Sequence, residues 1–244
     1  MIITPAITNW LNWVVITSQP LRRYDANAFP IGFGSAAIVE YAGRRFLLSV
    51  AHVVNNDESD WVMDIGHDPK IGPGQETWRP RSFVYAGEAN HGTEVTGLLD
   101  FCYAELPSSL KSFYQYRSLV ASGKRRLRHV FRSDLSTLPN VEDVYAFAGE
   151  VNPAHLGSNI FCTDMVIFPG LKYLRTENEM HVFKLPVEHP GHSEFKGCSG
   201  APIVDMKKRI VALVCKGDEE QGLVYGISVT HCKPFLDFLC NVSV

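Results

Sequence analysis

Two short runs of residues in this chain could together form a hydrolytic site. Ser199 lies in the run Gly-Cys-Ser-Gly-Ala-Pro, which begins at Gly197, and His52 ends the run Leu-Ser-Val-Ala-His. A serine hydroxyl is a weak nucleophile at neutral pH, so it needs an imidazole that removes its proton. A buried carboxylate must hold that imidazole in the productive tautomer. These residue types therefore allow acyl transfer through a serine nucleophile.

The carboxylate has one preferred candidate and two competitors. Asp100, in Leu-Leu-Asp-Phe-Cys-Tyr-Ala-Glu-Leu, lies between the histidine and the serine and precedes an alternating apolar run. Asp60 and Asp64 follow His52 closely in the chain. So short a spacing leaves too little chain for the strands that must intervene. We prefer Asp100 and keep the other two as alternatives.

The turn around Ser199 carries the most specific pattern. Gly197 permits a backbone geometry that residues with side chains disfavour. That geometry can direct the N–H groups of Gly197 and Ser199 at one point, which would form an oxyanion hole for charge developing on a substrate carbonyl. Gly200 leaves room for substrate, and a hydrophobic run from Ile210 follows. A tight β-turn with an incidental serine is the alternative, and the correctly ordered His52 argues against it.

Together these motifs resemble the trypsin/chymotrypsin-fold serine peptidases. The resemblance covers about residues 30 to 240, with specific motifs only around His52, Asp100 and Ser199. It implies a serine endopeptidase that acts on proteins or peptides without a metal or cofactor. It also implies that His52 and Asp100 come from a first β-barrel and Ser199 from a second, with the active site between them.

The pattern of short apolar runs separated by Gly, Pro, Asn and Asp predicts many short strands. We therefore predict an all-β fold, with two six-stranded-type antiparallel β-barrels of the chymotrypsin-like kind and a C-terminal α-helix. Ala42-Gly43 is typical of a hairpin turn, and Pro234 of the first turn of the terminal helix. The expected divisions are an N-terminal strap (1–30), a first β-barrel (31–106), an inter-barrel linker (107–139), a second β-barrel (140–230) and the helix (231–244).

The same resemblance assigns a substrate-binding pocket. Its floor is Ser193, and its walls come from the segment Glu194 to Lys196 and from Cys215, Lys216 and Gly217. Because the floor carries no aspartate, we expect an apolar or uncharged residue before the cleaved bond. Three nearby glutamates leave a basic residue open as the alternative: Glu194, Glu219 and Glu220.

Two positions depart from the secreted members of the family. Those that are activated by cleavage carry an aspartate before the nucleophile, which pairs with the new N-terminus, and here that position is Cys198. Ala201 stands where a glycine is usual. We therefore expect the intact chain to be competent, or to be switched on by a protein activator or ligand. The same departures motivate a rival interpretation, a catalytically silent pseudoprotease that acts as a protein-binding module.

Composition favours an ordinary soluble globular protein. The chain has 244 residues, of which 45% are hydrophobic and 20% charged, and a net charge of −3. This charge gives no general attraction to nucleic acid or to anionic membranes. A basic cluster between Lys124 and Arg132 could bind nucleic acid, but we interpret it as a solvated face of the linker. We expect neither a nucleic-acid nor a membrane partner.

The cysteines and the N-terminus predict a cytoplasmic protein. Cys102, Cys162 and Cys215 lie in apolar strand-like runs, where free cysteine behaves as a small buried hydrophobe. We expect all six cysteines to be free thiols. The first residues lack the basic and uninterrupted apolar regions of a signal peptide. By resemblance to cytosolic bacterial members, the chain is expected to be a regulated protease, with antiviral defence as one such setting.

Overall fold

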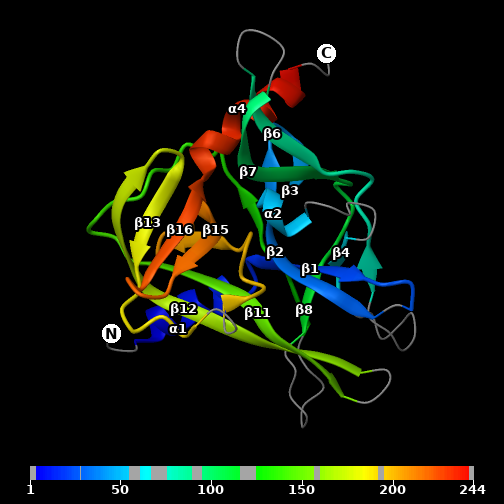
Figure 1. Cartoon of the computed structure of the whole chain (residues 1–244), viewed down its shortest axis with the longest axis horizontal. Coiled ribbons are helices and arrows are strands. Elements are labelled where there is room, and N and C mark those ends of the chain that lie inside the picture. The colour runs from blue at the N-terminus through cyan, green and yellow to red at the C-terminus, as the bar shows by residue number, and fades with distance from the viewer. Residues whose placement is uncertain are drawn as a thin grey trace.

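The computed structural model describes residues 4–27, 29–54, 61–66, 76–89, 95–115, 125–156, 160–191 and 195–241. Strands predominate in it, and Figure 1 shows them in two groups with a helix crossing the top. In chain order the elements are α1 (Pro5–Val15), β1 (Ser18–Tyr24), β2 (Pro30–Tyr41), β3 (Arg44–Ser49), α2 (Ala51–Val54), β4 (Trp61–Asp64), β5 (Thr77–Trp78), β6 (Val84–Ala89), β7 (Val95–Leu106), β8 (Phe113–Gln115), β9 (Arg125–Leu127), β10 (Val130–Arg132), β11 (Tyr145–Leu156), β12 (Ile160–Glu177), β13 (Met180–Lys184), β14 (Pro202–Asp205), β15 (Ile210–Asp218), β16 (Leu223–Ser228) and α4 (Val229–Asn241).

The second half of the chain forms a closed antiparallel barrel. Its six strands follow the order β11-β12-β13-β16-β15-β14. The rings of Phe147 and Phe168 stack inside it with centroids 4.7 Å apart, and Phe195 packs on both. Buried aromatic rings of this kind contribute strongly to the stability of a protein core. The predicted six-stranded second barrel is confirmed.

The first half forms a curled sheet. Its strands follow the order β5-β4-β1-β2-β3-β7-β6, and β10 pairs with β2 as an additional, parallel strand. Within the described residues this sheet has eight strands rather than six. The hairpin predicted at Ala42-Gly43 joins β2 to β3, and both residues have positive φ, 47° and 77°. Two such residues give a turn whose twist matches that of the flanking strands. The all-β architecture is confirmed.

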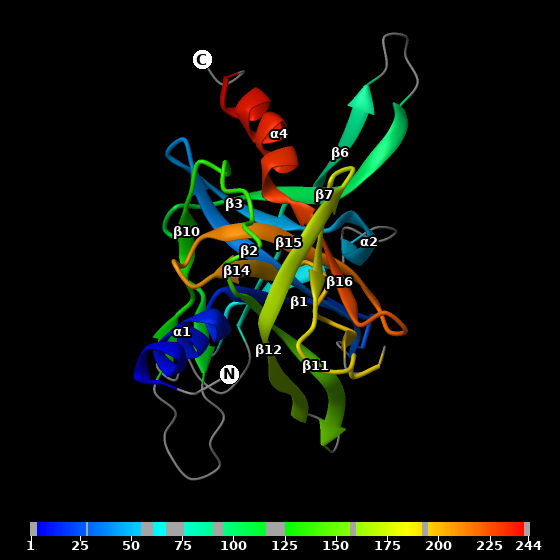
Figure 2. The ribbon, with the colours of Figure 1, turned by 90° about the vertical axis from the view of Figure 1, so that its left-hand side faces the viewer.

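The segment assigned to an N-terminal strap contributes to both halves. β1 lies between β4 and β2, so it is an interior strand of the first sheet. α1 begins at Pro5 after the N-cap Thr4, whose hydroxyl accepts the N–H of Ile7. α1 packs on β11 and β12, and the indole N–H of Trp10 donates to the Asp205 carbonyl at 2.9 Å. Both α1 and β1 are thus integral parts of the fold (Figure 2).

The linker between the halves contains the strands β8, β9 and β10. Arg126 and Arg132 of its basic cluster are exposed, as a solvated face requires, whereas Lys124 lies outside the described residues. Arg128 departs from that interpretation. Its side chain is buried and lies 3.7 Å from a carboxylate oxygen of Glu150 in β11. The cluster is therefore divided between solvent and the interior.

The C-terminal helix α4 begins at Val229, slightly before the predicted position. Pro234 lies inside the helix rather than in its first turn, so that prediction was wrong. The helix is retained because Cys232 and Leu236 are fully buried and Phe235 packs near Phe101 of β7. Tertiary packing of this kind outweighs a lost helical hydrogen bond. None of the helices in the described ranges is long and apolar enough to cross a membrane.

Candidate active site

His52 is positioned by a single helical turn at the end of a buried strand. β3 ends at Ser49, and α2 follows at once with Ala51 and Val53 buried on either side of the histidine. The side chain of His52 is 47% exposed, so its ring faces outward from the first sheet while its neighbours anchor the backbone. An imidazole held in this way is accessible to a bound molecule.

Asp100 lies directly against this histidine. It belongs to β7, which pairs with β3 so that Ser49 lies opposite Cys102. One carboxylate oxygen accepts the backbone N–H of His52 at 2.9 Å, and the other lies 2.7 Å from the ring Nδ1. Burial alone would raise the pKa of Asp100, but the hydrogen bonds from His52 and Cys215 outweigh it and lower that pKa. The carboxylate is therefore ionised at neutral pH and can orient the ring.

The competing carboxylates lie elsewhere or are not described. Asp64 is buried in β4, where its carboxylate lies 3.7 Å from Arg22 and its carbonyl accepts the side-chain amide of Gln19. Asp60 lies outside the described residues. Of the two carboxylates whose positions are described, Asp100 is the one in contact with His52.

Ser199 lies in a turn that two glycines make possible. Gly197 has φ +105°, and a Cβ built on it would lie 2.3 Å from the carbonyl oxygen of Glu150. Gly200 has φ +87°, and its Cβ would lie 1.9 Å from the carbonyl oxygen of Ser35. Both positions exclude a side chain for reasons of strain and of space. The turn therefore packs closely against β2 of the first sheet on one side and β11 of the second barrel on the other.

The backbone of this turn has two N–H groups with no internal acceptor. The amides of Cys198, Gly200 and Ala201 donate to Phe195, Val214 and Cys198. Within the described part of the chain, those of Gly197 and Ser199 donate to no backbone or side-chain group. Such a pair of amides can donate hydrogen bonds to a negatively charged oxygen of a substrate.

Cys215 connects the serine to the aspartate. Its carbonyl accepts the Ser199 hydroxyl at 3.4 Å, and its Sγ donates to Asp100 Oδ2 at 2.8 Å. The pairing of β15 with β16 shifts register between Val214 and Lys216, which leaves Cys215 at a bulge. A bulge can redirect a side chain in this way. Among the described residues, Ser199 Oγ makes no hydrogen bond to His52.

The atoms of His52, Asp100 and Cys215 also have the composition of a metal site. One potential ligand atom from each lies within 4.8 Å of the others. Zinc would need Cys215 as a thiolate. Burial, and next the charge of Asp100, raise the pKa of the Cys215 thiol well above its ordinary value. In this structure the neutral thiol donates a hydrogen bond to Asp100 Oδ2 at 2.8 Å, so these atoms form a hydrogen-bond network.

The predicted substrate pocket is only partly described. Its floor residue Ser193 and the neighbouring Glu194 lie outside the described residues. Lys196 is exposed, and the ammonium group of Lys216 lies 4.8 Å from the centre of the Tyr225 ring. Gly217 is exposed, and a Cβ built on it would lie 2.4 Å from the ring of His189.

The wall that can be described is aromatic. The His189 ring packs on Phe195, with ring centroids 4.7 Å apart, and Gly217 lies against the histidine. Phe195 lies within the segment from Glu194 to Lys196 that was predicted to form one wall of the pocket. These contacts show which residues border the turn, and the assignment of the pocket stays a prediction.

Comparison with solved structures places this architecture among known folds. The crystal structure of a serine endoprotease from Yersinia pestis matches it with a TM-score of 0.57 and 12% sequence identity, over 99% of this chain and 68% of that chain. The chain has a trypsin-like serine protease fold. At this identity the likeness establishes the trypsin-like fold, and an activity must be proposed from the site residues themselves.

A human pathogenic astrovirus serine protease also matches, with a TM-score of 0.44 and 13% identity, over 88% of this chain and 90% of that chain. No protein-family model and no curated protein matches the sequence.

Several residues around the site were not predicted. Ser35 donates its hydroxyl to the Gly197 carbonyl at 2.8 Å, and its N–H donates to the Ser199 carbonyl at 2.8 Å. Ser49 donates in turn to the Ser35 carbonyl. Cys215 was predicted as a pocket residue, without its bond to Asp100. All of these contacts join distant parts of the chain, which spacing alone does not reveal.

Proposed function

We propose that the chain is a serine endopeptidase in which Ser199 is the nucleophile, His52 the general base and Asp100 the residue that orients His52. One observation supports this most directly. The Asp100 carboxylate binds the ring and backbone of His52 and the thiol of Cys215, whose carbonyl in turn holds the Ser199 hydroxyl. Base, carboxylate and nucleophile therefore belong to one continuous network. Proteins and peptides are the expected substrates.

The mechanism begins with a rotation of the serine. Ser199 Oγ leaves the Cys215 carbonyl and turns to His52 Nε2, a rearrangement that bound substrate commonly induces in such sites. Nε2 removes the hydroxyl proton as Oγ forms a bond to the substrate carbonyl carbon. Nδ1–H remains bonded to ionised Asp100, which stabilises the imidazolium. The imidazolium then gives its proton to the departing amine, and water repeats the sequence to release the acid.

The Gly197 and Ser199 amides donate hydrogen bonds that stabilise the negative charge developing on the substrate oxygen. Their N–H groups have no other acceptor among the described residues. Loss of one such donor typically costs about 10² to 10³ in rate. The close packing of the turn against β2 and β11 supports a fixed orientation of both amides.

Labelling with a fluorophosphonate tests this proposal. Ser199 Oγ would form a bond to phosphorus while fluoride leaves and His52 takes the proton. We expect rapid labelling of the intact chain and its loss in Ser199→Ala and His52→Ala. Ser136→Ala, at an exposed position in the linker, is the matched control and should label as the wild type does. Labelling that persists in Ser199→Ala would refute the assignment of the nucleophile.

The rival function is a pseudoprotease that binds proteins without cleaving them. The observation that favours it is the direction of the Ser199 hydroxyl, which donates to Cys215 rather than to His52. A pseudoprotease would show no labelling under any activating condition, yet would still bind a peptide in the pocket. The preference for an uncharged residue before the cleaved bond, a protein activator, a cytoplasmic location and a role in bacterial defence stay predictions from the sequence.

A further inference from the structure

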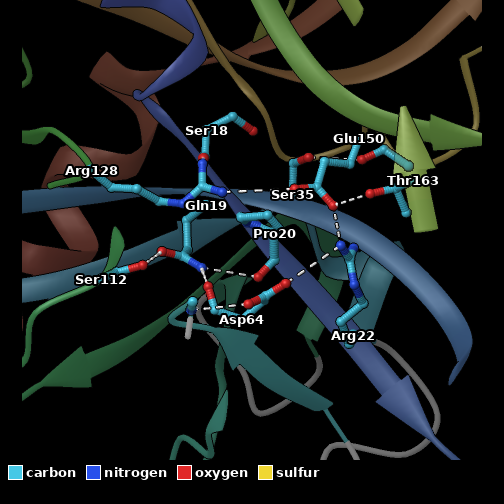
Figure 3. Close-up of polar contacts among 12 residues, drawn as sticks. Ser18, Gln19, Pro20, Arg22, Ser35, Asp64, Ser112, Arg128, Glu150 and Thr163 are labelled. Atoms are coloured by element: carbon cyan, nitrogen blue, oxygen red, sulfur yellow. Dashed lines mark hydrogen bonds and ion pairs between the residues drawn. The ribbon is translucent and has the colours of Figure 1, made fainter. Parts of the chain in front are cut away.

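Four charged side chains meet in the interior between the two halves of the molecule. We call Arg22, Asp64, Arg128 and Glu150 the buried charge cluster. They come from β1 and β4 of the first sheet, from the linker segment before β10 and from β11 of the second barrel. The side chains of Arg22 and Arg128 are 0% and 4% exposed. Figure 3 shows Arg22 between the two carboxylates.

Glu150 is the member that receives the most donors. Arg22 Nη2 contacts its Oε2, Thr163 donates its hydroxyl to the same oxygen at 2.6 Å, and Arg128 lies 3.7 Å from Oε1. Burial alone would raise the pKa of Glu150, but Arg22 and Arg128 outweigh it and lower that pKa. The carboxylate stays ionised. Removing one partner of such a buried pair leaves an uncompensated charge, which is strongly unfavourable.

The backbone at Glu150 is also the support of the Ser199 turn. Its carbonyl oxygen occupies the space that a Cβ on Gly197 would need, at 2.3 Å. A Cβ on the preceding Gly149 would lie 2.5 Å from Cys198 Sγ. Residues 149 and 150 therefore touch both residues that precede the nucleophile. A shift of this backbone would move the Gly197 amide directly.

The turn itself carries no charge that could fix it. Cys198 occupies the position before the nucleophile, and burial raises the pKa of its thiol to about 12, so the thiol stays neutral. The backbone that packs against the turn at Gly197 carries a charged side chain, the Glu150 carboxylate, which pairs with Arg22. Arg22 belongs to β1, an interior strand of the first sheet. The centre of the Phe33 ring, in the neighbouring strand β2, lies 5.6 Å from its guanidinium carbon.

We propose that Glu150, held by Arg22 and Thr163, is the positioning residue for the oxyanion hole formed by Gly197 and Ser199. The ion pair fixes the 149–150 backbone of the second barrel to the first sheet, directly behind the turn. It thereby sets the direction of the Gly197 amide without any cleavage of the chain. This inference rests on the proposed peptidase function and concerns the same site.

A positioning role predicts more than a loss of stability. Glu150→Gln keeps the shape of the side chain and removes its charge, so the turn should lose its fixed orientation while the substrate pocket persists. We expect kcat and the rate of fluorophosphonate labelling to fall roughly 10- to 100-fold, with KM changed less than about threefold. Affinity for a peptide aldehyde, whose adduct needs the oxyanion hole, should fall in parallel with kcat.

The control is a variant that destabilises the protein elsewhere. Phe46→Leu leaves a cavity in the core of the first sheet, at a fully buried residue of β3. Melting temperatures of both variants are measured, and activities are compared well below the lower one. Phe46→Leu should label within about twofold of the wild type, since Phe46 makes no contact with His52, Asp100 or Ser199 in the hydrogen bonds and ring contacts described, and a core cavity lowers stability.

The outcomes separate the two proposals. If the wild type labels and Glu150→Gln labels at the same rate, or loses no more than Phe46→Leu, the positioning role is refuted while the peptidase stands. If the wild type never labels, the peptidase and the role that rests on it both fail. Should Glu150→Gln not fold, Thr163→Val removes one donor to the same carboxylate. A fall of about three- to tenfold in kcat would then support the inference, and an unchanged kcat would refute it.

Discussion

The thiol of Cys215 donates to the same carboxylate oxygen of Asp100 that lies against the His52 ring, with Sγ and Oδ2 2.8 Å apart. A cysteine from the second barrel thus completes the surroundings of a carboxylate from the first sheet. The carboxylate is 24% exposed, so each donor that replaces water matters to its charged state. The network around the candidate base is therefore shared between the two halves of the molecule.

Substitution of Cys215 tests this contact. Cys215→Ser keeps a donor to Asp100 and should retain activity within about threefold, whereas Cys215→Ala removes the donor and should lower kcat/KM about tenfold. The loss is moderate because a thiol is a weak donor. Steady-state kinetics of the two variants provide the comparison. Equal activity of the alanine and serine variants would show that the thiol contributes nothing to catalysis.

Asp100→Asn is expected to cause the largest loss of any single carboxylate change. The amide keeps the size of the side chain but favours the wrong tautomer of His52, so kcat should fall roughly 10⁴-fold. Asp134→Asn, in an exposed turn of the linker, serves as control and should keep full activity. A comparable loss in both variants would contradict the assignment of Asp100.

The cysteines should differ in reactivity. Cys102, Cys198, Cys215, Cys232 and Cys240 are free, and Cys240 is the one of these five that is not fully buried. Burial raises the thiol pKa of Cys198, Cys215 and Cys232, so these thiols should resist alkylation in the native protein. Among these five, peptide mapping should find Cys240 modified first. After denaturation we expect six reactive thiols, and fewer, restored by a reductant, would reveal a disulfide.

Acid should destabilise the second barrel through His181. This ring is 2% exposed and bonds to the Thr176 hydroxyl at 2.8 Å. Burial, followed by the charge of His231, lowers the pKa of His181 to about 4 from 6.5. At pH values between about 4 and 6.5, His181 is protonated in the unfolded chain and neutral in the folded protein. The free energy of unfolding should therefore fall by about 3 kcal/mol as pH drops from above 6.5 to below 4.

The variant His181→Phe isolates this effect. It fills similar space beside Tyr173 and Phe183 without titrating. Urea unfolding at a series of pH values should give a flatter profile for the variant than for the wild type. Parallel profiles would mean that His181 is not the group responsible.

Trimming the N-terminus should weaken the protein and leave it no more active. Removal of α1 takes away Trp10, which is 3% exposed and bonded to Asp205, and should cost about 2 to 4 kcal/mol. A cut beyond Tyr24 would delete β1 and prevent folding, because β1 is an interior strand. Thermal melts and peptide cleavage by a deletion series test this. Activity that appears only in a trimmed form, and disappears when its new amine is acetylated, would contradict the inference from Cys198.

The sequence predicted the local features of this fold well. Hairpin geometry at Ala42-Gly43 and the strands on either side follow from turn chemistry and alternation. The candidate His52, Asp100 and Ser199 were found because each stands at the end or start of an apolar run in a recognisable order.

The features that the sequence did not predict depend on long-range register. No residue type in the sequence around Cys215 indicates the bulge that directs its side chain toward Asp100. The pairing of Arg22 with Glu150 joins residues whose neighbours are ordinary strand sequences. β1 lies in the segment that was assigned to a strap. Its run Ser-Gln-Pro-Leu-Arg-Arg-Tyr is largely polar, and its pairing with β2 and β4 is what makes it a strand.

The contact between Ser35 and Gly197 affects the order in which the protein folds during its synthesis. The hydroxyl and the carbonyl that it binds are separated by 162 residues in the chain. Contacts of such high sequence separation form late, because much chain must be ordered before they contribute. A nascent chain on the ribosome would hold a complete first sheet long before residue 197 is made. The turn that carries the proposed nucleophile would thus be assembled only after synthesis is nearly finished, and under the proposed function an unfinished chain would have no peptidase activity.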